Sequence, residues 1–98
     1  MDDKQWEIVK GKYQKKQVIR GVVEYHTPFG VFLDIDEGSI KGLIPITNFL
    51  DEGVMSVDLY PSIGNEIEAV IIDFSQDNRY QIWLSVKPSS FQLITDNI

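Results

Sequence analysis

The sequence predicts an all-β fold in which five short strands close into a small barrel. From Val18 onward, apolar and polar residues alternate with a period of two, which is typical of half-buried strands. Turn-forming residues interrupt the alternation at short intervals, and no crossover helices separate the predicted strands. A closed barrel leaves no exposed sheet edge, whereas a sandwich normally requires about seven strands.

The predicted elements are one helix, five strands and one helical turn. Trp6, Val9 and Tyr13 share one face of a helix over the first dozen residues, which Asp2 or Asp3 can cap. Strands are predicted over residues 18–26, 31–35, 41–45, 67–74 and 80–86, with a helical turn over 45–51, a long loop over 51–65 and an irregular tail from residue 88. A helical turn between the third and fourth strands is the arrangement of an OB-fold barrel. We therefore divide the chain into an N-terminal helix (1–14), a barrel (15–88) and a C-terminal tail (89–98).

The alternation also assigns side chains to the two faces of each strand. Val31 and Leu33 point inward, so Phe32 between them points outward. In the first strand the pattern groups Tyr25 with Val23 on one face and His26 on the opposite face. Trp83 points outward on the last strand, where it covers the N-terminal helix or meets a partner.

Composition excludes several classes of protein. The chain has 98 residues, of which 43% are hydrophobic, enough for one core and too few residues for two ordinary domains. It has no cysteine, no apolar run long enough to span a membrane, and no signal-peptide pattern at its N-terminus, so we expect a cytoplasmic protein. No nucleophile motif accompanies its single histidine and no phosphate-binding glycine loop is present, so we expect no enzymatic activity, cofactor or metal.

Charge is distributed unevenly along the chain. The net charge is −6, yet residues 1–20 carry six basic and three acidic side chains, while the remainder carries three basic and twelve acidic ones. The basic segment is either a solvated helix ahead of an acidic domain or a short arm that reaches a phosphate backbone.

Six short motifs carry a resemblance that covers residues 6 to 88. They are Gly21-Val22-Val23, Pro28 to Asp34, Gly42 to Ile46, Ile63 to Ile67, Val70 to Asp73 and Ile82 to Lys87. In this order and spacing they closely resemble the S-one (S1) RNA-binding domain, an OB-fold module named after a protein of the small ribosomal subunit.

The resemblance implies a surface for single-stranded RNA, centred on Phe29 and Phe32. Base stacking would explain an outward Phe32, and Gly30 would leave room for a base to approach the sheet. The alternative is that Phe29 anchors its loop and Phe32 packs under the long loop.

The polar contacts that the resemblance implies are less complete. Pro45 stands where the family commonly has a histidine, so one expected RNA contact is missing. Asp77 and Arg79 resemble an acid and an arginine before the last strand, although counting back from Ser85 selects Gln81 instead. Further predicted contacts come from Lys41, which is otherwise a solvated turn lysine, and from Arg20 and His26.

Together these observations predict a non-enzymatic module that binds single-stranded RNA, associated with mRNA or the ribosome. The alternative is a protein-interaction or regulatory barrel that has lost RNA binding. Pro45 and the net −9 of residues 21–98 favour that alternative, because the acidic charge repels polyanions within a Debye length of about 8 Å.

Overall fold

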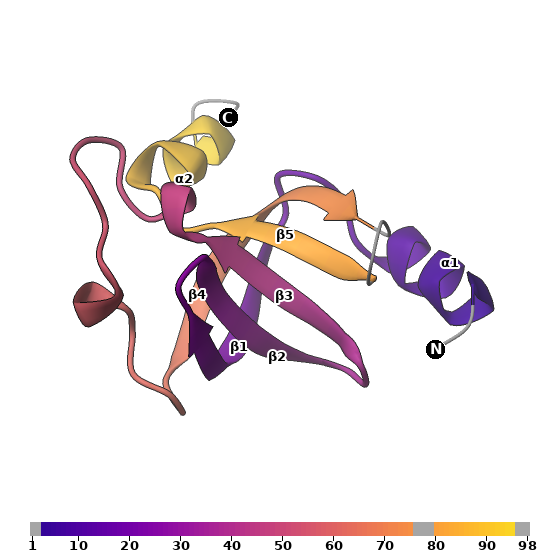
Figure 1. Ribbon diagram of the computed structural model, residues 1–98. Helices are drawn as coiled ribbons and strands as arrows, with labels where there is room; N and C mark the ends of the chain where they lie inside the picture. The colour runs from indigo at the N-terminus through magenta and orange to yellow at the C-terminus, as the bar shows by residue number, and fades with distance from the viewer. Residues whose placement is uncertain (1–2, 76–79, 96–98) are drawn as a thin grey trace.

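A computed structural model describes residues 3–75 and 80–95 and confirms the predicted barrel (Figure 1). Its elements, in chain order, are α1 (Asp3–Lys12), β1 (Val18–Thr27), β2 (Gly30–Glu37), β3 (Ile40–Pro45), the 3₁₀ turns η1 (Ile46–Asn48) and η2 (Val57–Leu59), β4 (Glu66–Ser75), β5 (Gln81–Ser85) and α2 (Pro88–Thr95). None of the helices in the described ranges is long and apolar enough to cross a membrane.

The five strands close in the order β1-β2-β3-β5-β4. Neighbouring strands are antiparallel, except that β3 and β5 run parallel. Inward-facing residues of every strand fill the interior, and Val31, Leu33, Ile82 and Leu84 are fully buried, as predicted. Helix α1 lies at one end of the barrel, and α2 and the loop between η1 and β4 lie towards the other end (Figure 1).

Two β-bulges change which side chains face outward. In β1, Val23 pairs with Leu33 and Tyr25 pairs with Phe32, so Glu24 is an extra residue. In β4, Ile71 pairs with Leu84 and Asp73 pairs with Trp83, so Ile72 is extra. A bulge inserts one residue and reverses the alternation beyond it. The predicted placement of Tyr25 on the face of Val23 is therefore wrong, because Tyr25 points outward.

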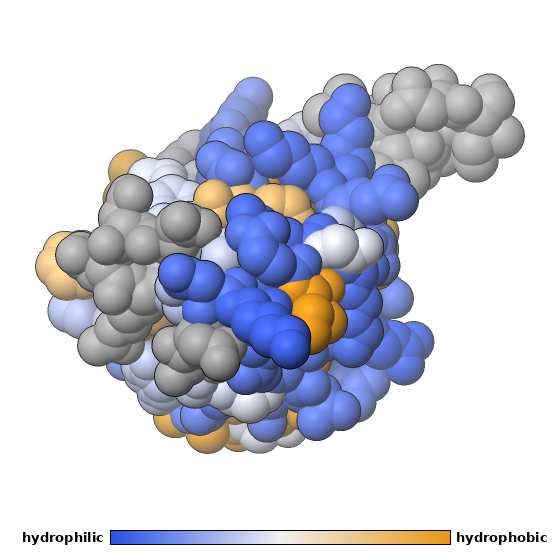
Figure 2. Space-filling model, turned by 90° about the vertical axis from the view of Figure 1, so that its right-hand side faces the viewer, coloured by the Kyte–Doolittle hydropathy of each residue, from blue (hydrophilic) through white to orange (hydrophobic). Residues whose placement is uncertain are grey.

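Helix α1 packs its apolar stripe against the barrel. Trp6 is 1% exposed, and its ring stacks on Tyr80 at a centroid distance of 5.1 Å and meets Phe74 edge-on at 6.2 Å. The rings that cover Trp6 thus come from the end of β4 and from the residue immediately before β5. Figure 2 shows this end of the molecule, where hydrophilic side chains dominate the surface around a small hydrophobic patch.

A hydrogen-bonded cluster fastens the end of α1 to the β2–β3 hairpin. The Glu37 carboxylate accepts hydrogen bonds from the Tyr13 hydroxyl at 2.5 Å and the Lys12 ammonium at 2.7 Å. Burial raises the pKa of Glu37, but the hydrogen bonds from Lys12 and Tyr13 and the Lys12 charge outweigh it, so the net shift is downward. Burial, together with the hydrogen bond to Glu37 and the carboxylate charges nearby, raises the pKa of Tyr13 to about 12.

This cluster predicts a loss of stability at alkaline pH. The pKa of Tyr13 is about 12 in the folded protein and 10.0 for an unperturbed tyrosine. The contribution of the Tyr13 hydroxyl to the free energy of unfolding is therefore complete below pH 10 and is lost as the pH rises towards 12. We expect Tyr13→Phe to lower the free energy of unfolding by about 1 kcal/mol at pH 8 and by much less at pH 12. Urea unfolding of both proteins at the two pH values measures this, and an equal difference at both would contradict it.

The expectation of an irregular tail from residue 88 is wrong, because Pro88–Thr95 forms α2. The Ser89 amide in the first turn donates a 3.0 Å hydrogen bond to Asp51 Oδ2, and the Ser89 hydroxyl also bonds Asp51. The Ser85 and Ser90 hydroxyls are 2.8 Å apart and join the helix to β5. A carboxylate distant in sequence thus satisfies the helix N-terminus, which no local capping pattern could indicate.

Candidate nucleic-acid interface

An aromatic pair lies on the outer face of β1 and β2. The rings of Tyr25 and Phe32 stack with centroids 4.7 Å apart and an interplanar angle of 17°. Tyr25 is 37% exposed and Phe32 is half-buried, so the pair presents an apolar surface to solvent. Phe32 points outward as predicted, and its packing partner is Tyr25.

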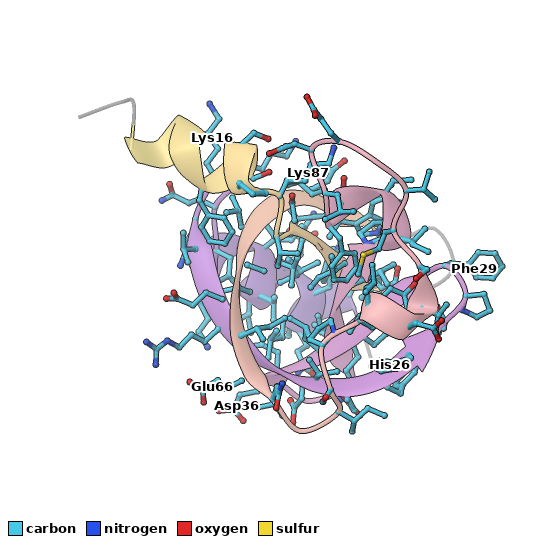
Figure 3. All side chains as sticks on the ribbon, turned by 90° about the vertical axis from the view of Figure 1, so that its left-hand side faces the viewer. Lys16, His26, Phe29, Asp36, Glu66 and Lys87 are labelled. Atoms are coloured by element: carbon cyan, nitrogen blue, oxygen red, sulfur yellow. The ribbon has the colours of Figure 1, made fainter. Side chains whose placement is uncertain are left out.

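Phe29 stands on the turn between β1 and β2. It is 79% exposed, and Figure 3 shows its ring projecting from the edge of the molecule. The Thr27 hydroxyl oxygen accepts hydrogen bonds of 3.1 Å from the amides of Phe29 and Gly30, which fixes the turn. The hydrogen-bonded turn therefore positions Phe29 with most of its ring free of packing, so the alternative of a packed loop anchor is wrong.

Gly30 has a different role from the one expected. A Cβ atom at this position would lie 2.3 Å from the Ile44 carbonyl oxygen and 3.0 Å from Pro45 Cα. The backbone of β3 already fills the space that a base was expected to enter. Gly30 is thus needed for the close approach of β2 and β3, which a side chain would push apart.

The outer face continues from the aromatic pair across the barrel. Phe32 on β2 pairs with Leu43 on β3, and Leu43 pairs with Trp83 on β5. Leu43 is half-buried and Trp83 is 36% exposed. We call Tyr25, Phe32, Leu43 and Trp83 the apolar row. The predicted outward orientation of Trp83 is confirmed.

Lys41 and Arg20, two barrel residues that were predicted to bind RNA, are both paired with carboxylates. Lys41 Nζ lies 2.9 Å from Glu24 Oε2, and this hydrogen bond is the main cause of a raised Lys41 pKa, with Asp34 contributing through its charge. Arg20 forms ion pairs with Glu66 at 3.2 Å and Glu68 at 3.7 Å. An RNA phosphate must therefore compete with fixed carboxylates at both positions.

The basic N-terminal segment is also partly neutralised. Lys10 pairs with Glu7 at 3.2 Å, Lys12 pairs with Glu37, and Lys15 pairs with Asp73 at 3.5 Å. Within the described ranges Lys4 and Lys16 have no ion-pair partner, and both are exposed. The segment thus offers fewer available cations than its sequence suggests.

His26 is held by the long loop. Beyond the Glu24 bulge it lies on the inward side of β1, half-buried, with Nε2 2.8 Å from the Pro61 carbonyl oxygen. Its ring meets Tyr60 edge-on at 5.2 Å, and Tyr60 also packs against Phe49. Figure 3 places His26 beside this loop. The predicted placement of His26 on the face opposite Val23 is therefore wrong, because the bulge reverses its orientation.

The remaining predictions concern Asp77, Arg79, Gln81 and Pro45. Asp77 and Arg79 fall outside the described residues. Gln81, the alternative to Arg79, is half-buried at the start of β5 and pairs with Lys41. Pro45, the departure from the family histidine, ends β3 opposite Gly30. These positions bring Lys41 and Gln81 together but leave His26 and Arg20 apart from them.

The residue that the sequence reasoning missed is Tyr25. Glu24 and Tyr25 are adjacent on β1 and both are exposed, whereas regular strand alternation exposes only one of two neighbouring residues. Neither residue type marks a bulge, so periodicity alone assigned Tyr25 to the wrong face.

Comparison with known families gives a clear result. The family described as the S1 RNA binding domain matches residues 12–87, which include all five strands. The chain belongs to this family. The resemblance seen in the six motifs is thereby confirmed, and so is the OB-fold barrel.

The chain spans less than a fifth of the length of the curated relatives named below. The small ribosomal subunit protein bS1 of Chlamydia muridarum is 28% identical over 84% of this chain, which covers 14% of that protein. A 4-hydroxy-3-methylbut-2-enyl diphosphate reductase of Clostridium tetani is 32% identical over 84% of this chain, which covers 13% of the enzyme. A chain of the a/eIF2alpha–aDim2p–rRNA complex of Pyrococcus horikoshii OT3 shares the fold, with a TM-score of 0.66, 19% identity, and coverage of 87% of this chain and 51% of its own.

Proposed function

We propose that this domain binds single-stranded RNA by stacking bases on Phe29 and on the Tyr25–Phe32 pair. The observation that carries the proposal is the stacked ring pair on the outer face of β1 and β2, beside an exposed Phe29. Every base has an aromatic face, so such a platform accepts single strands with little dependence on sequence. Membership of the S1 family supports RNA as the ligand.

The same surface limits the contribution of charge to binding. Lys41 and Arg20 are ion-paired, and the exposed side of β1 and β2 also carries Glu24 and Asp34. We propose that Arg79 supplies the main phosphate contact, with Lys41, Arg20 and the basic segment as weaker ones. Asp77 and His26 remain predicted contacts in this proposal, and His26 must release the Pro61 carbonyl oxygen to reach RNA.

The proposal predicts a weak dependence of RNA affinity on salt. With two to four phosphate contacts and about −0.7 per contact for single strands, log K against log[salt] should fall with a slope of about −1.5 to −3. A titration of fluorescent oligo-RNA between low and moderate salt measures the slope. A slope near −7 would show that many more phosphates are contacted, which would contradict binding dominated by stacking.

We further propose that the domain itself catalyses no reaction and acts in the cytoplasm, on mRNA or at the ribosome. The relatives that support a ribosomal setting are the bS1 proteins. Since this chain spans less than a fifth of each, their whole-protein activities and partners extend to it only as proposals.

A protein-interaction barrel is the second candidate. Leu50, Val54, Val57 and Leu59 expose apolar surface on and around the long loop, and Leu50 and Val54 also line a hollow of about 350 Å³. Asp51 and Glu52 lie beside them and fit a partner that combines apolar and basic side chains. The oligo-RNA titration separates the candidates, because absence of binding even at low salt would favour the protein partner.

A further inference from the structure

The geometry points to a second base-stacking position at Trp83, with Lys15 beside it to contact the phosphate of the stacked nucleotide. This inference rests on the proposed function and extends the RNA path from β1 and β2 across β3 to β5 and the edge of β4. Figure 1 shows β2, β3 and β5 side by side on one side of the barrel.

The strand register aligns Trp83 with the aromatic pair. Tyr25, Phe32, Leu43 and Trp83 are successive cross-strand partners on β1, β2, β3 and β5. Strands are about 4.8 Å apart, so three steps separate Tyr25 from Trp83 by about 14 Å. One base cannot cover this distance. Trp83 therefore serves a different nucleotide from the one on Tyr25 and Phe32.

Trp83 is not among the buried core residues, and the rings packed on Trp6 of α1 belong to other residues. The inward neighbours on β5 are Ile82 and Leu84, which are fully buried, and Trp6 on α1 packs against Phe74 and Tyr80. Trp83 remains 36% exposed, although exposing so large a ring forgoes favourable burial. A stacked base would cover the exposed part of the ring.

A lysine lies at this end of the apolar row. The Ile72 bulge places Asp73 opposite Trp83, and Lys15 Nζ lies 3.5 Å from Asp73 Oδ1. Hydrogen bonds from the Lys16 amide to the Ile71 carbonyl (2.7 Å) and from the Ile71 amide to the Gln17 carbonyl (2.8 Å) hold the segment against β4. Both side chains of the ion pair are more than 60% exposed, so the pair is weak and Lys15 can turn to a phosphate.

The first test compares Trp83→Ala with Trp83→Phe and with Ile8→Ala. Ile8 is 62% exposed on α1, is not part of the apolar row, and serves as the matched control. We expect Trp83→Ala to weaken binding of an oligo-RNA of about ten nucleotides at least fivefold, and Trp83→Phe to retain most of the affinity because it keeps a ring. Circular dichroism at the titration temperature verifies that each variant is folded.

Fluorescence gives a readout that does not depend on the alanine variant. The chain has two tryptophans, and Trp6 is 1% exposed, so RNA can quench only Trp83 directly. We expect saturating RNA to quench the wild-type emission and to leave the emission of Trp83→Phe unchanged. Lys15→Ala should flatten the salt slope by about 0.7, while Lys87→Ala, which changes a lysine beyond the end of β5 and outside the basic segment, should leave it unchanged.

The outcomes distinguish this inference from the proposed function. If Phe32→Ala weakens binding while Trp83→Ala binds as the wild type does and RNA quenches no tryptophan emission, the Trp83 position is wrong and the proposed function stands. If the wild-type protein binds no RNA at low salt, the proposed function itself fails, and the Trp83 position with it.

Discussion

Phe32→Ala is expected to weaken binding of single-stranded RNA by about five- to a hundredfold. Stacking on an aromatic side chain contributes about 1–3 kcal/mol per base, and this substitution removes one ring of the pair while leaving Tyr25 without its neighbour. Fluorescence anisotropy with a labelled oligo-RNA at low salt measures the loss. The effect should exceed that of Arg79→Ala, which removes one phosphate contact and should flatten the salt slope by about 0.7.

The control for Phe32→Ala must separate affinity from stability. Phe32 is half-buried against Tyr25, so we expect its removal to lower the free energy of unfolding by about 1 kcal/mol, which leaves the barrel folded. Leu59→Ala changes an apolar residue that is 63% exposed on η2 and should leave RNA affinity unchanged. A folded Phe32→Ala protein with wild-type affinity would remove the ring pair from the binding surface.

Among single substitutions, Trp6→Ala is expected to have the largest effect on stability. Replacing a buried tryptophan by alanine costs about 3–5 kcal/mol, and for a domain of this size each kcal/mol lowers the melting temperature by about 4–8 °C. The melting temperature should therefore fall by more than about 10 °C. Removal of residues 1–14 should have at least this effect, because it also removes Val9 and the Tyr13–Glu37 hydrogen bond.

Ile8→Ala is the matched control on the same helix, because Ile8 is 62% exposed and its substitution removes little buried surface. Thermal melts followed by circular dichroism compare the three proteins with the wild type. If Trp6→Ala and the truncated chain both have the melting temperature of the intact protein, α1 contributes nothing to the stability of the barrel.

The sequence predicted those parts of the fold in which the local pattern and the final contacts agree. Val31, Leu33, Ile82 and Leu84 alternate without interruption, and each points inward as predicted. Trp6 and Val9 share one face of α1 because helical spacing places them there, and both are buried. The six motifs identified the family, whereas periodicity alone reached only a small barrel.

The features that the sequence did not predict depend on contacts between distant residues. Helix α2 begins where Asp51 caps it, and the Glu24 bulge is visible only once β1 is paired with β2. The ion pairs that occupy Lys41, Arg20 and Lys15 likewise join residues on different elements, so counting basic residues overestimated the available positive charge. The sequence thus predicted the outward Phe32 and the exposed Phe29 of the candidate site, but it did not predict that Tyr25 points outward.

The bulge in β1 makes this surface sensitive to a change of a single codon. Glu24 is both the inserted residue that turns Tyr25 outward and the carboxylate that occupies Lys41. Deleting it would remove the bulge and place Tyr25 directly after Val23, so that Tyr25 would stay outward opposite Phe32 while Lys41 would lose its partner. A one-residue deletion would thus keep the aromatic pair and make the surface beside it more cationic. Sequence alignments that close a gap at position 24 will assign the wrong side chains to the surface of this domain.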